Sequence, residues 1–172
     1  MARIPYPDVE ALPAATREAL GKIRSINVFK LAAWADGMAP SFFAFVTDVF
    51  AKTALDPKLR QIAILRVGHV CQSAYETFQH EKLAKIVGLS DEQIQATRDG
   101  TSIQALDEQQ VAVLRFAEEM TTDIKVSDPV FAKVRAFLPE KELTELTIIT
   151  SFYSAICRFL ETMEIEIEPR AK

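Results

Sequence analysis

Helix-start signals recur along the whole chain. Asp56-Pro57 and Asp128-Pro129 each place an acidic N-cap before a proline at the first helical position. Ser90-Asp91-Glu92-Gln93 fits a capping box. Only 5 glycines interrupt the 172 residues, and apolar residues within 113–124 follow the spacing of one helical face. The sequence therefore predicts an all-α fold.

The same signals mark out about seven to nine helices. No internal repeat or linker-like shift in composition separates them, so we predict a single domain over residues 1–172. Apolar and acidic residues alternate only in the tail 164–168, which we expect to extend along a surface or a partner subunit. The expected helices cover residues 8–21, 27–35, 39–53, 57–70, 73–87, 91–98, 107–124, 128–137 and 140–162.

Two of these helices are apolar on nearly every side, through residues 61–67 and 146–153. A helix that is apolar all round must be covered all round. In a domain of this size, a subunit interface can supply part of that cover. We therefore expect the chain to form a homo-oligomer.

Charge and hydropathy indicate which partners to expect among nucleic acids, membranes and small molecules. The 20 basic and 24 acidic residues are interspersed and leave a net charge of −4, so no basic stripe predicts nucleic-acid binding. The N-terminus has no apolar signal core. The longest uncharged run, 146–157, has about a dozen residues, whereas a membrane span needs about 20. We expect a cytoplasmic protein whose partner is a small molecule.

The two cysteines, Cys71 and Cys157, lie far apart in the sequence and form neither Cys-x-x-Cys nor a zinc-binding spacing. The plain interpretation is two buried free thiols. A nucleophilic role for Cys71 would need a nearby base, and His80 is not at helical spacing from it. Cys71 remains a candidate for lining a substrate site.

The candidate chemistry lies in the segment that ends at His80. Glu76 is four residues before His80, so the two share a helix face and can form a hydrogen bond. A carboxylate beside an imidazole favours the protonated ring and fixes its orientation, which suits a general acid or base. Ser73 and Tyr75 are candidate substrate-binding residues. The alternative is a purely structural contact, and a plain buried or interface position is the interpretation for His69.

No metal or organic cofactor is predicted. Glu76 and His80 would supply two metal ligands, and the sequence offers no evident third.

Three segments form a further pattern: Leu59-Arg60-Gln61-Ile62-Ala63-Ile64-Leu65-Arg66-Val67, Tyr75-Glu76-x-x-x-His80 and Ala84-Lys85-Ile86-Val87-Gly88-Leu89-Ser90-Asp91-Glu92-Gln93-Ile94. Together they resemble the central part of the carboxymuconolactone decarboxylase family, in the alkyl-hydroperoxidase D-like superfamily. The resemblance implies an all-helical fold, an active region at the start of the helix that carries His80, and oligomers such as dimers, trimers or hexamers.

The redox branch of that superfamily carries Glu-x11-Cys-x2-Cys-x3-His. With His80 as the histidine, the two cysteine positions fall on Ser73 and Glu76, and the acidic position falls on Gln61. A thiol–disulfide cycle needs an attacking thiolate and a resolving cysteine. The sequence therefore predicts negligible thiol-dependent peroxidase activity through this motif.

The decarboxylase branch acts on a lactone of aromatic-ring catabolism and needs an acid/base together with a cation for carboxylates. His80 with Glu76 could supply the first, and Arg66 or Arg158 the second; the alternative is that each arginine pairs with a buried acid. Our first interpretation is a lyase or hydrolase-type enzyme on a carboxylated small molecule. The alternatives are an alkylhydroperoxidase or peroxiredoxin-like antioxidant, and a non-catalytic binding or assembly module.

Overall fold

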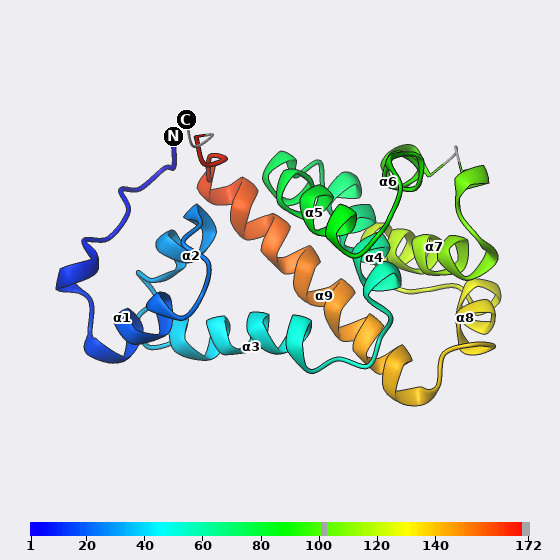
Figure 1. The fold of residues 1–172 in the computed structure, drawn as a ribbon, viewed down its shortest axis with the longest axis horizontal. Coiled ribbons are helices and arrows are strands. Elements are labelled where there is room, and N and C mark those ends of the chain that lie inside the picture. Colours follow the sequence, from blue (N-terminus) through cyan, green and yellow to red (C-terminus); the bar gives the residue numbers. More distant parts are fainter. Residues whose placement is uncertain (101–102, 170–172) are drawn as a thin grey trace. The chain divides into compact units, whose positions relative to one another are not determined.

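A computed structural model describes residues 1–100 and 103–169 (Figure 1). The expected all-α fold is confirmed, because this part of the chain forms nine α-helices and two short 3₁₀ helices and no strand. The chain divides into two compact units, Met1–Thr53 with Thr162–Lys172, and Ala54–Glu161.

The first unit contains α1 (Ala14–Gly21), α2 (Asn27–Ala32) and α3 (Ala39–Ala51). Helix α1 packs against α3. The rings of Phe29, Phe42 and Phe43 meet edge to face, with centroids 5.7 to 6.3 Å apart. The first expected helix is shorter than predicted, because Pro13 stands at its N-cap and a separate 3₁₀ turn, Val9–Ala11, precedes it.

The alternating tail runs along this same unit. The Glu166 carboxylate accepts hydrogen bonds from Ala2 N at 2.8 Å and from the Tyr6 hydroxyl at 3.1 Å. The Glu168 carboxylate accepts from Asn27 N at 2.6 Å. The acidic residues of the alternation therefore attach the C-terminal segment to the N-terminal one.

The second unit is built around α4 (Pro57–Val70), which packs against α5 (Ala74–Ile86), α6 (Asp91–Asp99) and α7 (Glu108–Thr122). Every residue from Leu59 to Gly68 is buried. The sequence-based prediction that this helix must be covered on all sides is therefore confirmed.

The helix starts follow the predicted capping chemistry closely. The Asp56 carboxylate accepts from Lys58 N and Leu59 N, at 2.8 and 3.1 Å, at the start of α4. Ser90 and Gln93 form the expected capping box at α6. One start is shifted: α8 (Asp128–Arg135) has Ser127 at its N-cap, so Asp128 lies in its first turn.

Helix α9 (Glu140–Met163) spans 24 residues. Within the described residues it is the one helix long and apolar enough to cross a membrane by length and composition alone. A core helix of a soluble protein meets the same criterion, and 39% of the apolar window of α9 is buried inside the chain. Its buried side includes Tyr153, Cys157 and Leu160.

Candidate functional site

A tight turn between α4 and α5 positions the site. Ser73 N donates to Gly68 O at 2.9 Å and Gln72 N donates to His69 O at 3.1 Å, which is the bonding pattern of a Schellman motif. Gln72 occupies the left-handed position with φ of +56°. A residue other than glycine there costs roughly 1–2 kcal/mol. The chain therefore breaks between α4 and α5, as the separate helices predicted over 57–70 and 73–87 require.

Gly68 lets the two helices come close at this turn. A Cβ atom on Gly68 would lie 3.0 Å from Thr77 Cγ2 and 3.4 Å from Glu76 Cγ. The first distance is tighter than most real Cβ contacts, so a larger residue here would require the Thr77 side chain to shift by a few tenths of an ångström. This close approach brings Glu76 and the rest of the first turns of α5 against α4.

The His80 ring lies between two side-chain oxygens. Its Nδ1 is 2.9 Å from Gln61 Oε1 on α4, and its Nε2 is 2.9 Å from Glu76 Oε1 on α5. His80, Gln61 and Glu76 are 6%, 1% and 4% exposed. The predicted pairing of Glu76 with His80 is therefore present, and Gln61 joins it from a second helix.

The protons in this cluster follow from the chemistry of its acceptors. A carboxamide oxygen can only accept a hydrogen bond, so His80 Nδ1 carries a hydrogen and donates it to Gln61. His80 Nε2 then faces the Glu76 carboxylate at 2.9 Å. The ring is thus held between an amide oxygen on α4 and a carboxylate oxygen on α5.

Tyr153 of α9 closes one side of the cluster. Its ring meets His80 edge to face, with centroids 5.0 Å apart and planes at 80°. Burial raises the pKa of the Tyr153 phenol well above its ordinary value, and the Glu76 carboxylate raises it further. The phenol therefore stays protonated and can act only as a neutral neighbour of the pair.

The predicted lining residues fall at the start of α5. Ser73 is the buried N-cap residue of α5 but makes no capping hydrogen bond, and its hydroxyl lies beside the Cys157 thiol. Tyr75 is buried in the first turn. A role of Ser73 or Tyr75 in substrate binding stays a prediction.

The two cysteines meet. The thiols of Cys71, in the turn after α4, and Cys157, in α9, lie within hydrogen-bonding reach of each other, and both cysteines are free. The expectation of two buried thiols is right for Cys157, which is fully buried, and wrong for Cys71, which is half-buried. The break in the helix explains the difference, because it leaves Cys71 at the surface of the turn.

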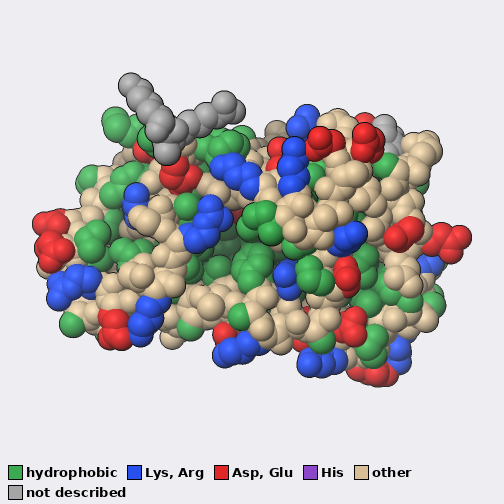
Figure 2. Space-filling model, in the orientation of Figure 1, with side chains coloured by type: hydrophobic (Ala, Val, Ile, Leu, Met, Phe, Trp, Pro, Cys, Tyr) green, Lys and Arg blue, Asp and Glu red, His purple; other side chains and the backbone are tan. Residues whose placement is uncertain are grey.

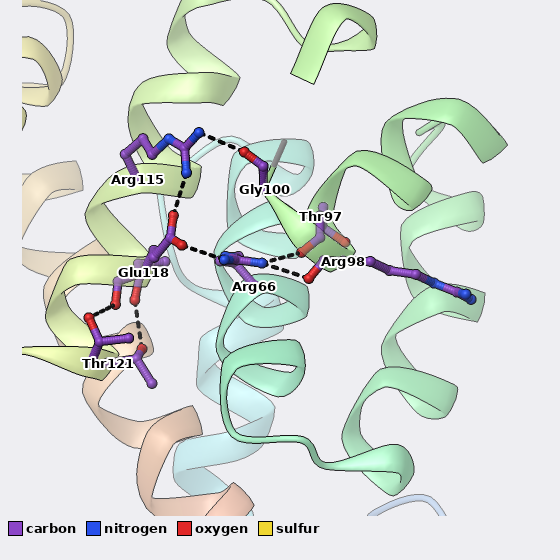
Figure 3. Close-up of polar contacts among 9 residues, drawn as sticks. Arg66, Thr97, Arg98, Gly100, Arg115, Glu118 and Thr121 are labelled. Atoms are coloured by element: carbon purple, nitrogen blue, oxygen red, sulfur yellow. Dashed lines mark hydrogen bonds and ion pairs between the residues drawn. The ribbon is translucent and has the colours of Figure 1, made fainter. Parts of the chain in front are cut away.

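Arg66 is held inside the second unit (Figure 3). Its guanidinium donates to Thr97 O at 3.2 Å and to Arg98 O at 2.7 Å, and it forms an ion pair with Glu118. Arg115 donates to the same carboxylate at 2.6 Å. The donors of Arg66 thus point to α6 and α7. Of the two arginines predicted to bind a substrate carboxylate, Arg158 is therefore the better placed.

Arg158 lies on the exposed side of α9 near the turn. One guanidinium nitrogen donates to Ser154 O at 2.9 Å, and its positive charge lowers the pKa of Cys71. The residue is exposed. Arg158 therefore places a cation beside Cys71, at the turn that precedes α5.

The charges that act on His69 come from outside the Gln61–His80–Glu76 cluster. Burial lowers the pKa of His69 to about 4, and the Arg98 and Arg66 guanidinium groups lower it further. Its Nε2 has no hydrogen-bond partner in the part of the chain that the structure describes. The folded protein therefore keeps this ring neutral, which accords with a plain packing role.

A neutral, half-buried histidine gives the stability of the fold a defined dependence on pH. The unfolded chain takes up a proton at His69 below about pH 6.5, whereas the folded chain does so only near pH 4. Stability contributed here is therefore lost as the pH falls from 6.5 to 4. We expect His69→Gln to show a smaller drop in unfolding temperature between pH 7 and pH 4.5 than the unmodified protein, measured by thermal unfolding at both pH values. Equal drops would contradict the neutral state of His69.

Within residues 1–100 and 103–169, no group of three His, Cys, Asp or Glu side chains is placed to hold a metal ion. On the face drawn in Figure 2, acidic and basic side chains are interspersed.

Fold and site define an all-α protein with a buried histidine held between α4 and α5. Residues 37–119 match the carboxymuconolactone decarboxylase family, which confirms the resemblance inferred from the sequence. This match includes α3 to α6 and most of α7, and therefore Gln61, Glu76 and His80.

Solved structures share the whole fold. A peroxidase-related protein from Ralstonia eutropha JMP134 superposes with a TM-score of 0.84 at 20% identity, covering 97% of this chain and 92% of that one. A peroxidase-related protein from Silicibacter sp. TM1040 gives 0.82 at 16% identity, with the same coverage. A cysteine-to-alanine variant of the debrominase Bmp8, in complex with 2,3,4-tribromopyrrole, gives 0.79 at 14% identity, covering 98% and 94%. No curated protein sequence matches this chain.

Three members of the cluster were not predicted as site residues. Gln61 entered the sequence argument only as a replaced acidic position, while Tyr153 and Cys157 belonged to an apolar helix. All three contact the predicted residues from other helices. Spacing along one helix cannot reveal such contacts. Aligning the redox motif on His80 does indicate Gln61, because the acidic position of that motif falls on Gln61.

Proposed function

We propose that this protein is a small enzyme of the carboxymuconolactone decarboxylase family that transfers a proton to or from a carboxylated, lactone-like molecule. The observation that carries the proposal is the His80 ring held at 2.9 Å from both Gln61 and Glu76. A buried imidazole positioned beside a carboxylate is an arrangement that general acid–base catalysis uses. Within it, His80 is the acid/base and Glu76 its partner.

Compared with the redox motif, the carboxylate has changed position. The acidic position holds Gln61, and the second cysteine position holds Glu76. Both side chains still contact the same histidine. The rearrangement retains an acid/base pair and removes the Cys-x-x-Cys thiols, which supports proton transfer rather than the redox chemistry of that motif.

The substrate class follows from the charge beside the turn. Arg158 offers an exposed cation near Cys71, and a guanidinium binds carboxylates in a bidentate geometry. In this proposal Arg158 anchors the carboxylate, and Cys71 and Ser73 line the approach. The chemistry needs no cofactor.

The test is a turnover screen of carboxylated lactones and open-chain carboxylates with the purified protein. We expect at least one lactone to be converted faster than its spontaneous reaction, and that carboxylate to raise the unfolding temperature. Binding without turnover across the panel would instead favour the non-catalytic binding module. Turnover unaffected by Arg158→Gln would remove the anchor from the proposal.

We also propose that the protein works as a homo-oligomer. Apolar side chains remain exposed on the single chain, among them Ile148 of α9 at 48% and Phe131 of α8 at 44%. A stable interface should bury more than about 1,000 Å² in total. Sedimentation or scattering at micromolar concentration is expected to give a mass well above the 19.2 kDa of one chain. A mass near that of one chain would contradict this expectation.

A further inference from the structure

An open cavity lies between α7 and α8, which pack against each other in the second unit (Figure 1). Its volume is about 690 Å³, and small-molecule sites commonly occupy roughly 300–1,000 Å³. None of its lining residues belongs to the Gln61–His80–Glu76 cluster. The cavity is therefore a candidate for a second binding site.

Helix α7 forms one wall of the cavity. Glu108, Val111, Ala112 and Arg115 all line it, and their spacing of three, four and seven residues places them on one helix face. The two central side chains are apolar, while a carboxylate and a guanidinium stand at the two ends. This wall therefore suits a molecule with an apolar body and a charged end.

Helix α8 and the residues that follow it form the other wall. Val130 and Phe137 contribute apolar surface, and Lys133 lies between them in the sequence. Lys133 is exposed, and no carboxylate in the part of the chain that the structure describes forms an ion pair with it. Its ammonium group thus keeps its three donors for a ligand.

Arg115 is the second cation of the cavity, and two hydrogen bonds anchor it (Figure 3). It donates to the Glu118 carboxylate at 2.6 Å and to Gly100 O at 2.6 Å. These bonds use two of the five N–H groups of a guanidinium. Glu118 also pairs with Arg66, so two guanidinium groups share one carboxylate. Arg115 therefore retains both donors and positive charge for another acceptor.

We propose that the cavity between α7 and α8 binds a small amphipathic carboxylate of the medium-chain fatty-acid type. The ligand carboxylate pairs with Lys133 and Arg115, and its apolar chain packs between the two helices. This site goes beyond the proton transfer proposed above, because it requires no member of the histidine cluster and no chemical step.

Glu108 determines which way the ligand lies. Seven residues separate Glu108 from Arg115 on α7, which is about 10 Å along a helix. The Glu108 carboxylate repels an anion at its own end of the cavity. The ligand carboxylate therefore lies toward Arg115, and the chain extends along Val111 and Ala112.

The test compares three eight-carbon ligands that differ in the charge of the head group: octanoate, 1-octanol and octylamine. Each is titrated into the full-length protein at pH 7 and followed by isothermal titration calorimetry. We expect octanoate to bind most tightly, octanol more weakly and octylamine least. Absence of octanoate binding, or octylamine binding as tightly as octanoate, would overturn the proposal.

Hydrogen–deuterium exchange locates the bound octanoate. We expect slower exchange in the segments 106–115 and 130–137, and no change in 73–80. Protection confined to 73–80 would place octanoate at the histidine cluster and would refute the cavity as its site. Protection of 106–115 and 130–137 that appears without octanoate and rises with protein concentration would assign the cavity to a second copy of this chain, with the same result.

Variants test the charge at the rim. Lys133→Gln should weaken octanoate binding by about fivefold, the upper end of the range measured for exposed ion pairs, and should leave octanol binding unchanged. Val130→Asp, which adds a negative charge to the wall, should abolish octanoate binding. The matched control is Lys82→Gln, which removes an exposed cation from α5 and should bind octanoate normally.

Circular dichroism checks that all three variants fold. Equal weakening in Lys133→Gln and Lys82→Gln would show that only the net charge matters, which contradicts a site at the cavity. Because these assays measure binding and not lactone turnover, their failure is distinguishable from failure of the acid/base proposal.

Discussion

Replacing His80 with Gln is expected to lower turnover by roughly 10²–10⁴-fold, the usual contribution of a positioned acid or base. Glutamine can still form hydrogen bonds with Gln61 and Glu76, but its amide cannot accept and release a proton as an imidazole does. The folded state should therefore persist. Turnover of a lactone found in the screen and thermal unfolding of the same protein sample together measure both effects.

The matched control is His69→Gln, which changes the only other histidine in the sequence. We expect it to retain normal turnover, because His69 makes no contact with the Glu76–His80 pair in the proposed chemistry. If His80 were structural, His80→Gln would leave turnover unchanged and would cost about 1–3 kcal/mol of stability by depriving buried Glu76 of its partner. That pair of results would refute the catalytic assignment.

Arg66→Met is expected to lower the free energy of unfolding by about 3 kcal/mol, the lower end of the range for removing one partner of a buried ion pair. The change deprives the carbonyl groups of Thr97 and Arg98 of their donor, and leaves Glu118 with Arg115 alone (Figure 3). The lower end applies because the Glu118 side chain is 24% exposed. Urea denaturation at pH 7 measures the loss.

Two comparisons define the source of that loss. Arg66→Lys keeps the charge but cannot reach both carbonyl groups and the carboxylate at once, so it should fall between the unmodified protein and Arg66→Met. In the double variant Arg66→Met/Glu118→Gln, the effects should add to less than the sum of the single changes. Strict additivity would show that Arg66 and Glu118 do not stabilise each other.

The same network predicts a pH dependence. Burial acts to raise the pKa of Glu118, but hydrogen bonds from Arg115 and Arg66 outweigh it and hold the pKa below its ordinary value. A carboxyl group with a lowered folded pKa stabilises the fold above its unfolded pKa, and the contribution disappears as the pH falls through the lowered value. Arg66→Met should therefore lose less stability on acidification than the unmodified protein.

Most of the fold could be predicted from local chemistry. The boundaries of α4 were predicted to the residue, because Asp56-Pro57 starts it and the apolar run continues to its end. The first helix was predicted too long, since the capping argument did not account for Pro13. The division into two compact units was not predicted, because it depends on long-range contacts that no shift in composition marks.

The sequence predicted the site contact within one helix but not the contacts between helices. The spacing of Glu76 and His80 correctly indicated their contact, since residues four apart in a helix share a face. The contact of Cys71 with Cys157 depends on the break at Gln72 and on how α9 packs. The partners of Arg66 lie on α6 and α7. Neither arrangement follows from any single segment.

Holding His80 at both nitrogens has a consequence for motion. A half-turn of the ring about its Cβ–Cγ bond would place carbon atoms against Gln61 and Glu76, and would break both 2.9 Å contacts together. Ring flipping should therefore be rare. The Glu76 side chain has more rotatable bonds than the His80 side chain, and its carboxylate contacts the ring through one oxygen. In the proposed proton transfer, the imidazole therefore keeps one orientation throughout.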